Sequence, residues 1–325
     1  MTGWVPRWNP GPDAAAETLR GIQEWLRSPS LSTLLGEWGI EAPGGLSEGA
    51  LLEWLDRFSA EHWDFRRGRE RNLAVDAELT SRQEAAALRC APALGLAESW
   101  PLEASYDAVI MTGGMVRAGV VKPRFVRRLL DEGIDARHVV FLGAHREFAG
   151  DESILAAELG ISGADEVDAM TAGVERAFGV RESRRVSAGM GYARTTSVRW
   201  RDHEHPRFEV IAAPSRAATT RRADTADTFE HWASRFGGEG TQSAEGRAPS
   251  VLVVTTPIYV PYQAAVAVEV LGIRHGMRVE TVGVDATASD LGEFTQRFLP
   301  QHHLQELRSA VRGIRSLHER LQHLA

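Results

Sequence analysis

The sequence predicts an α/β protein with a doubly wound, mainly parallel, Rossmann-like sheet and an added helical N-terminal region. Three observations support this prediction. From residue 106 onward, short continuous apolar runs alternate with helical segments, a pattern typical of parallel strands covered on both faces. In the first hundred residues, apolar side chains recur instead at the three- and four-residue spacings of helices. The composition is that of a globular protein, with 43% hydrophobic and 25% charged residues.

Three helices are expected in the N-terminal region, where Leu, Ile and Trp repeat on one face of each segment. The third segment opens with two overlapping capping signatures, Thr80 to Gln83 and Ser81 to Glu84, and should stop at Gly95. The three segments span residues 13–27, 46–63 and 80–96.

Five apolar runs are the expected parallel strands, at residues 106–114, 137–146, 207–215, 250–257 and 278–285. Helices are expected between them, at residues 123–133, 151–160 and 224–236 and before Gly272. The first of these helices should begin only at Pro123, because the residue before a proline favours an extended conformation. Alternating residues on both sides of "DHEHP" (202–206) predict a hairpin that leads into the third run.

The chain is expected to divide into a helical region (1–100), an α/β domain (101–288) and a C-terminal helical segment (289–325). Apolar residues of the last segment form one stripe along a helix. Such a stripe packs either on the domain or on a second copy in a homodimer. The stripe contains Leu304, Leu307, Val311, Ile314, Leu317 and Leu321.

Charge and cysteine content restrict the class of protein. The net charge of −7 excludes a global basic field that would draw the chain to nucleic acid. The single cysteine, Cys90, excludes an internal disulfide framework, and we expect it to be a small buried side chain. No N-terminal signal peptide and no long apolar span are visible, so we expect a cytoplasmic protein with no membrane contact.

Polar residues follow each apolar run, where the carboxyl ends of parallel strands meet at one edge and ligands bind. After the first run come Gly113, Gly114, Arg117 and Lys122, and after the second come His145, Arg146 and Glu152. Arg222, Thr225 and Asp227 follow the third run, and Thr255, Thr256 and Tyr259 follow the fourth. We therefore expect one binding site that all four strand ends share.

These residue types favour an anionic ligand. Glycines at a strand end let backbone N–H groups approach a phosphate, and arginines pair with phosphate or carboxylate. Arg117 is expected on this loop as an anion clamp, assisted either by Lys122, the single lysine of the chain, or by Arg222. The loop matches neither the dinucleotide fingerprint nor the P-loop. Glu152 and Asp227 are candidates for acid–base or hydroxyl-binding work, although an acidic residue at a helix start also serves as a cap.

Two further clusters have more than one interpretation. His203 and His205 in "DHEHP" are compatible with a metal ion, but no third ligand has a recognised spacing and a hairpin turn is the better interpretation. The segment 63–71, "WDFRRGRER", interleaves arginines with aromatic residues. It is either a solvated, salt-bridged helix face or a contact with RNA.

The strand ends from 106 to 285 resemble the YdcF/SanA-type family, a Rossmann-like family. The resemblance lies in the Gly113–Gly114 loop, in acidic Glu152, in the "DTADT" segment (224–228) and in Thr255–Thr256. It implies a site at the strand ends, a link to cell-envelope metabolism and, for some members, S-adenosylmethionine. Tyr259 and Tyr262 stand where that family has His and Arg, and the helical first hundred residues have no counterpart there.

Three functional hypotheses follow. The first is an intracellular transferase of specialised metabolism that binds an adenosine-containing, nucleotide-bearing or phosphorylated ligand at the strand ends. The second is an aminoacyltransferase that uses aminoacyl-tRNA and grips the RNA through residues 63–71. The third is a non-catalytic sensor or scaffold for a ligand such as S-adenosylmethionine, acting as a dimer through residues 303–323.

Overall fold

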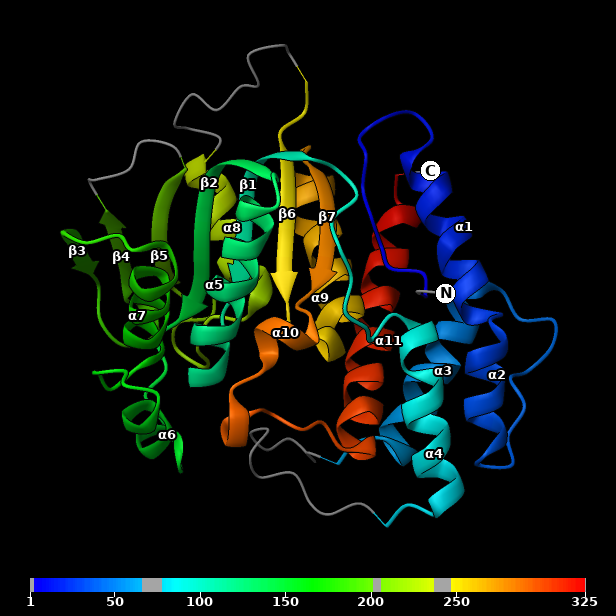
Figure 1. The fold of residues 1–325 in the computed structure, drawn as a ribbon. Coiled ribbons are helices and arrows are strands. Elements are labelled where there is room, and N and C mark those ends of the chain that lie inside the picture. Colours follow the sequence, from blue (N-terminus) through cyan, green and yellow to red (C-terminus); the bar gives the residue numbers. More distant parts are fainter. Residues whose placement is uncertain (1–2, 66–77, 201–205, 237–246, 325) are drawn as a thin grey trace.

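The computed structural model describes residues 3–65, 78–200, 206–236 and 247–324, and within these ranges the chain forms a seven-stranded sheet (Figure 1). The strand order is β3-β4-β5-β2-β1-β6-β7. Neighbouring strands from β5 to β7 run parallel, whereas β3 and β4 are antiparallel additions at one side. The predicted α/β class with a mainly parallel sheet is therefore confirmed. The strands are β1 (Ser105–Thr112), β2 (Asp135–Ala144), β3 (Ser183–Ala188), β4 (Thr195–Trp200), β5 (Arg207–Ala213), β6 (Ser250–Thr255) and β7 (Arg278–Gly283).

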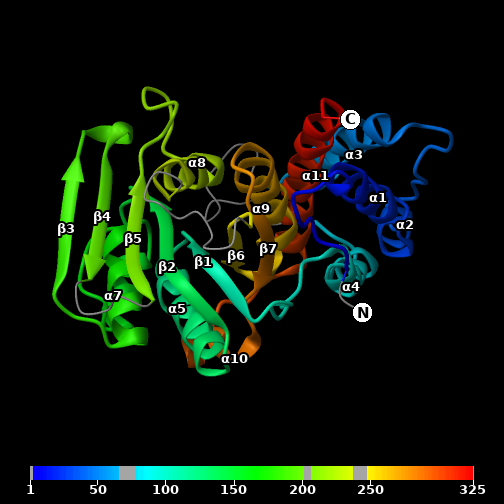
Figure 2. The ribbon, with the colours of Figure 1, turned by 90° about the horizontal axis from the view of Figure 1, so that it is seen from above.

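Helices cover both faces of the sheet, as Figure 2 shows from above. Val109 and Met111 of β1 pack into the apolar cluster that includes α5 and α7. Ala108 and Ile110 point to the other face and pack into the cluster of α8 and the segment after α9. Burying one such aliphatic side chain stabilises the fold by about 1.5–3 kcal/mol. The covering helices are α5 (Val116–Asp131), α7 (Glu166–Phe178), α8 (Thr225–Phe236) and α9 (Val260–Ala267), which continues as a π-helical stretch (Val268–Arg274).

Helix α5 corrects one expectation, because it begins at Val116 and contains Pro123 in its interior. A proline inside a helix leaves the carbonyl of the residue four positions earlier, here Gly119, without an N–H partner. That position faces α7, where a Cβ on Gly173 would lie 1.7 Å from the Gly119 oxygen. The two helices therefore cross almost backbone to backbone, and this packing overrides the local preference at Pro123.

The helical N-terminal region is confirmed. At the start of α4, the Thr80 hydroxyl accepts the N–H of Gln83 at 3.3 Å and Gln83 Oε1 accepts the N–H of Thr80 at 3.0 Å, which is the predicted capping box. Cys90 at the end of α4 is buried, and burial raises the pKa of its thiol. The helices are α1 (Ala14–Leu26), α2 (Pro29–Gly36), which was not predicted, α3 (Glu48–His62) and α4 (Ser81–Cys90).

The C-terminal helix α11 (Pro300–Gln322) lies between the edge of the sheet that β7 forms and the N-terminal helices (Figure 1). All six residues of its apolar stripe are 0% exposed and pack in one cluster with α1 to α4 and α9. The chain itself therefore covers the stripe. Among the described residues, no helix combines the length and the apolar character that crossing a membrane requires.

The predicted hairpin is present as the antiparallel pair β4–β5. The residues between these strands, with His203 and His205, lie outside the described ranges, and so do Arg66, Arg67, Arg69 and Arg71. The metal and RNA interpretations of these segments stay predictions. Three shorter elements complete the part that concerns the site: α6 (Glu152–Glu158), a helical turn (Pro257–Tyr259) and α10 (Ala286–Ser289).

Candidate ligand site at the carboxyl edge of the sheet

The strand order reverses between β1 and β6, which are neighbours in the sheet but are separated in the chain by β2, β3, β4 and β5. At this point the helices that follow the two strands turn to opposite faces, which opens room for a ligand beyond the strand ends. The Thr112 hydroxyl donates a hydrogen bond of 3.0 Å to the Thr255 hydroxyl across the junction, and both side chains are buried. The predicted site residue Thr255 therefore lies at the reversal itself.

Lys122 lies directly beneath this junction, although it comes from the second turn of α5. Its side chain is 1% exposed. The ammonium donates to the Thr112 carbonyl oxygen at 2.5 Å, to Thr112 Oγ1 at 2.9 Å and to the Gly113 carbonyl oxygen at 3.3 Å. The predicted cationic residue thus binds the inner side of the glycine loop and places a positive charge under it.

The same contacts orient the loop. In a trans peptide the C=O and the following N–H point in opposite directions. Because Lys122 binds the Gly113 carbonyl, the N–H of Gly114 points away from the ammonium, and it donates to Glu166 Oε1 at 2.5 Å. Glu166 Oε2 accepts the N–H of Ala144, at the end of β2, at 3.4 Å. The loop therefore does cradle an anion, and that anion is a carboxylate of the chain.

Close backbone approach explains the first glycine of this loop. A Cβ on Gly113 would lie 2.9 Å from Glu166 Oε1 and 2.8 Å from the Cα of Gly143. Any larger residue would push the carboxylate out of the cradle. Burial raises the pKa of Glu166, against the opposing charge of Arg146 and the N–H groups of Gly114 and Ala144.

Glu166 was missed in the sequence because α7 was not predicted. Two signals for that helix exist: "DEVD" (165–168) opens it with an N-cap and early acids, and Gly179 ends it.

Glu152 forms a second buried carboxylate beside the first. Its Oε1 accepts the N–H of Val116, the first residue of α5, at 3.2 Å, and its Oε2 accepts the N–H of Ala149 at 3.2 Å. The guanidinium of Arg146 lies 3.6 Å from Glu152 Oε1. The start of α5, where the helix dipole favours negative charge, is thus occupied by Glu152 and Glu166 in this structure. The structure brings Glu152 and Arg146 together beside the glycine loop.

Arg117 does not lie on a loop, which corrects the expectation. It belongs to the first turn of α5, and its Nε donates to the Phe294 carbonyl oxygen at 2.7 Å. Arg117 was expected on a loop because α5 was expected to begin at Pro123. The helix begins earlier, at Val116, and therefore includes Arg117. Arg117 therefore links α5 to the segment that follows α10.

His145 follows β2 and lies on the side of the site toward β4. Its Nε2 lies 3.2 Å from the hydroxyl of Thr196 in β4. Burial lowers the pKa of His145, and the nearby positive charge of Arg194 acts in the same direction. The neutral imidazole is therefore favoured. In this form one ring nitrogen donates a hydrogen bond and the other accepts one.

Asp227 lines a separate hollow of about 250 Å³ between the end of β5 and α8. The carboxylate is 1% exposed and receives hydrogen bonds of 2.6 Å from both Arg216 and Arg221. Burial would raise its pKa, but the two guanidinium groups outweigh burial and lower it. His231, one turn further along α8, lines the same hollow and was not among the predicted residues.

The remaining predicted residues lie around the ends of β5 and β6. Thr225 begins α8, and its hydroxyl accepts a hydrogen bond of 3.2 Å from Gln263. The Thr256 carbonyl accepts the N–H of Tyr259 at 2.9 Å, and the Tyr259 ring meets Phe298 edge to face with 6.4 Å between ring centroids. The positive charge of Arg222 opposes the rise in the pKa of Glu166 that burial causes, so Arg222 is near enough to act on this carboxyl.

Comparison with known proteins relates the chain to mycobacterial proteins. A family model described as the Rv3785 N-terminal domain matches residues 9–95. The uncharacterized protein Rv3785 of Mycobacterium tuberculosis is 28% identical over an alignment of 347 positions, gaps included. This alignment covers 96% of this chain and 93% of that protein. The uncharacterized protein Mb3814 of Mycobacterium bovis matches with the same identity and coverage. No solved structure matches the chain significantly.

These matches overturn the resemblance to the YdcF/SanA-type family. The similarity to Rv3785 extends over nearly the whole chain and includes the N-terminal helices, which the resemblance left without a counterpart. The motifs behind the resemblance were a glycine pair and threonines at strand ends. Parallel sheets of many unrelated functions use such residues where backbones approach closely, so they do not define a family.

Proposed function

We propose that the protein is a cytoplasmic enzyme of the transferase class, which binds a phosphorylated or nucleotide-bearing ligand at the carboxyl edge of a Rossmann-like sheet. Numbered in chain order, the five parallel strands have the spatial order 3-2-1-4-5. This is the order of a doubly wound sheet, in which ligands bind at the reversal. The strand order supports the location of the site and the proposed subclass of the fold.

One observation carries the choice of an anionic ligand: Lys122 turns the N–H of Gly114 outward at the reversal, where it binds a carboxylate at 2.5 Å. A phosphate oxygen would take the same N–H in place of Glu166. Burial raises the pKa of Glu166, which means that the buried position disfavours its charged form, and this lowers the cost of the exchange. Arg146 and Arg222 would then pair with the ligand.

The acid–base roles follow from the same geometry. Glu152 is held by two N–H groups and Arg146. Its carboxylate is oriented to accept either a proton or a hydrogen bond from a hydroxyl group of the acceptor substrate. Asp227 is engaged by two arginines and serves as a positioning residue for them. Tyr259 stands near the end of β6, where it can line the acceptor side. Group transfer suits a site that combines an anion cradle with a separate carboxylate.

The test is calorimetric titration of the full chain with inorganic pyrophosphate, ADP and UDP at low salt. We expect binding of at least one probe, and we expect Arg146→Gln to weaken it roughly tenfold or more, since a charge-assisted hydrogen bond contributes about 1.5–3 kcal/mol. The matched control is Arg127→Gln, an exposed arginine at the other end of α5 that pairs with Asp131. Absence of binding by all three probes, or equal affinities of the two variants, would show that the proposal is wrong.

A further inference from the structure

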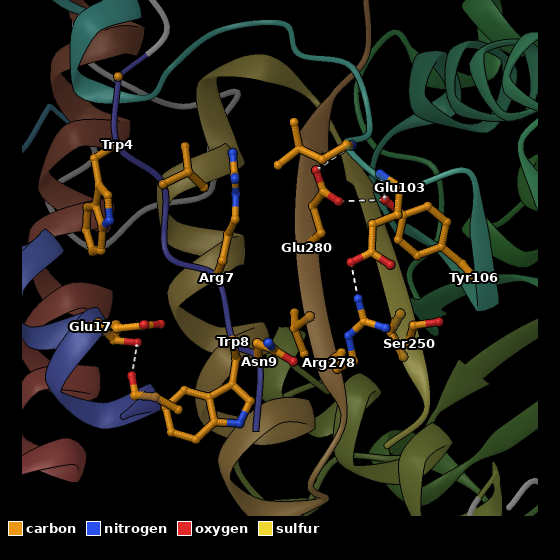
Figure 3. A pocket seen from close by; sticks show the side chains of 17 residues that line it. Trp4, Arg7, Trp8, Asn9, Glu17, Glu103, Tyr106, Ser250, Arg278 and Glu280 are labelled. Atoms are coloured by element: carbon orange, nitrogen blue, oxygen red, sulfur yellow. Dashed lines mark hydrogen bonds and ion pairs between the residues drawn. The ribbon is translucent and has the colours of Figure 1, made fainter. Parts of the chain in front are cut away.

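A cavity of about 540 Å³ lies at the amino edge of the sheet, where the parallel strands begin, and is distinct from the site described above (Figure 3). One wall is formed by the starts of β1, β6 and β7, with Tyr106, Arg278 and Glu280. The opposite wall is formed by residues 3–9 and by α1. Its volume is in the range typical of small-molecule sites. We call it the amino-edge cavity.

The N-terminal segment (residues 3–9) is an ordered wall of this cavity, because it is fixed by backbone pairing and by side-chain packing. The N–H of Trp8 donates to the Val279 carbonyl at 3.1 Å and the N–H of Val279 donates to the Trp8 carbonyl at 2.8 Å, so the segment pairs with β7. The Trp8 indole lies on Gly272, where a Cβ would be 2.7 Å from Trp8 Cγ. The Trp4 indole lies on Gly21 of α1 in the same manner, with 2.0 Å from such a Cβ to Trp4 Nε1. Both indoles therefore have fixed positions.

The sheet wall carries an oriented carboxylate. Glu280 accepts a hydrogen bond of 2.6 Å from the Tyr106 hydroxyl and one of 3.0 Å from the N–H of Leu102. Burial raises the pKa of Tyr106, so its hydroxyl stays a neutral donor and leaves the negative charge of Glu280 uncompensated. Arg278 on the same wall pairs with Glu103, so these two charges cancel.

The opposite wall carries one charge of each sign. Arg7 comes from the N-terminal segment and Glu17 from α1, and both side chains are exposed to the cavity mouth. Neither side chain forms an ion pair with any residue in the described ranges. With the Arg278–Glu103 pair neutral, the carboxylates of Glu17 and Glu280 outnumber the guanidinium of Arg7. Indole rings attract cations as well.

We propose that the amino-edge cavity is a second ligand site, which binds a small organic cation through the carboxylates of Glu17 and Glu280 and the indoles of Trp4 and Trp8. The ligand class is a primary amine of metabolite size. It is either a simple diamine or an amino acid with a cationic side chain. In the latter case Arg7 binds the α-carboxylate, because a guanidinium pairs with a carboxylate in a bidentate manner.

The proposal is tested by calorimetric titration of the full chain with 1,4-diaminobutane, L-lysine and the uncharged 1,4-butanediol. We expect an amine to bind and the diol not to bind. Glu17→Gln and Glu280→Gln should each weaken amine binding roughly tenfold, the effect of one charge-assisted hydrogen bond. Glu24→Gln, an exposed glutamate on the same helix that does not line the cavity, should leave the affinity unchanged.

The two amines distinguish the sources of the ligand. Tighter binding of L-lysine, lost in Arg7→Gln, identifies an amino acid, whereas tighter binding of the diamine identifies a simple amine. Equal binding of the diol and the amines overturns the proposal, and so does an unchanged affinity in Glu17→Gln, whose exposed position makes misfolding an inadequate explanation. Saturating pyrophosphate should not change the affinity for the amine, so this result does not depend on the site at the carboxyl edge.

Discussion

The two edges of the sheet handle charge in opposite ways. At the carboxyl edge, Glu152, Glu166 and Lys122 are buried. The two glutamates accept hydrogen bonds from backbone N–H groups, and Lys122 donates to backbone carbonyls. At the amino edge, charged side chains such as Arg7 and Glu17 line a cavity of about 540 Å³ and stay exposed. A buried charge is tolerated only where it is paired and hydrogen-bonded. The carboxyl edge therefore joins the proposed function to stability, and the amino edge can vary with little effect on folding.

The largest effect on this comparison is expected from Lys122→Met. Methionine keeps the shape of the side chain but removes the donor to Thr112 and Gly113, in a place closed to water. We expect a loss of about 3–5 kcal/mol in the free energy of unfolding, as for other broken buried charge networks. Urea unfolding of the two proteins measures it. Arg127→Met, at an exposed position of the same helix, is the control and should cost less than about 0.5 kcal/mol. Similar losses in both variants would remove the distinction between buried and exposed charge.

A smaller loss is expected from Asp227→Ala. This change leaves Arg216 and Arg221 without their shared acceptor, but both guanidinium groups are about half exposed, at 50% and 41%, and water replaces part of the interaction. We expect the free energy of unfolding to fall by about 2–3 kcal/mol, with a smaller fall for Asp227→Asn. The same urea titrations measure it. A loss below that of the exposed control would contradict the role assigned to this carboxylate.

The two carboxylates should shift the pH dependence of stability in opposite directions. The folded-state pKa of Asp227 is lowered, so its contribution is present above the unfolded value of about 3.9 and is lost as the pH falls. The pKa of Glu166 is raised, so the folded state holds its proton longer and stability falls as the pH rises above about 4.3. Asp227→Asn should therefore flatten the acid limb of a stability–pH curve, and Glu166→Gln the limb toward neutral pH.

Urea unfolding from about pH 3 to about pH 8 records both limbs of that curve. The glutamine that replaces Glu166 in this test keeps an oxygen to accept the N–H of Gly114 but loses the acceptor of the Ala144 N–H, so the dependence of stability on pH, and not its absolute value, reports the titration. If both variants flatten the same limb, the opposite shifts assigned to the two groups are incorrect.

The smallest effect is expected at the amino edge, from Glu17→Gln. The side chain is exposed and forms no ion pair with a described residue, so the free energy of unfolding should change by less than about 0.5 kcal/mol. Thermal unfolding with and without 1,4-diaminobutane measures both parts of the claim. Stability should be retained, and the increase in melting temperature that the amine causes should be reduced. A large loss of stability in the absence of amine would mean that this edge is also structural.

Local patterns in the sequence were sufficient for most of the fold. Apolar runs followed by polar residues predicted β1, β2, β5, β6 and β7, and the Thr80–Gln83 box predicted the start of α4, because these signals depend on neighbours a few residues away. The elements that were missed are α2, α7 and β3. Strand β3 is exposed along its whole length, so no buried apolar face marks it, whereas α7 does carry an N-cap and a terminal glycine. The early start of α5 was missed for another reason, since its interior Pro123 is stabilised by contact with Gly173 in α7.

The candidate site shows the same division. The sequence by itself determined that Gly113, Gly114 and Thr255 lie at strand ends, since a strand must stop where its apolar run stops, and that Glu152 lies at the start of the helix after β2. Only the tertiary structure decided that the reversal falls between β1 and β6 and that Glu166 occupies the N–H of Gly114. It also decided that Trp8 pairs with Val279 to close the amino-edge cavity. Strand order and these contacts join residues far apart in the chain, and they depend on the packing of whole helices and strands, which no local pattern encodes.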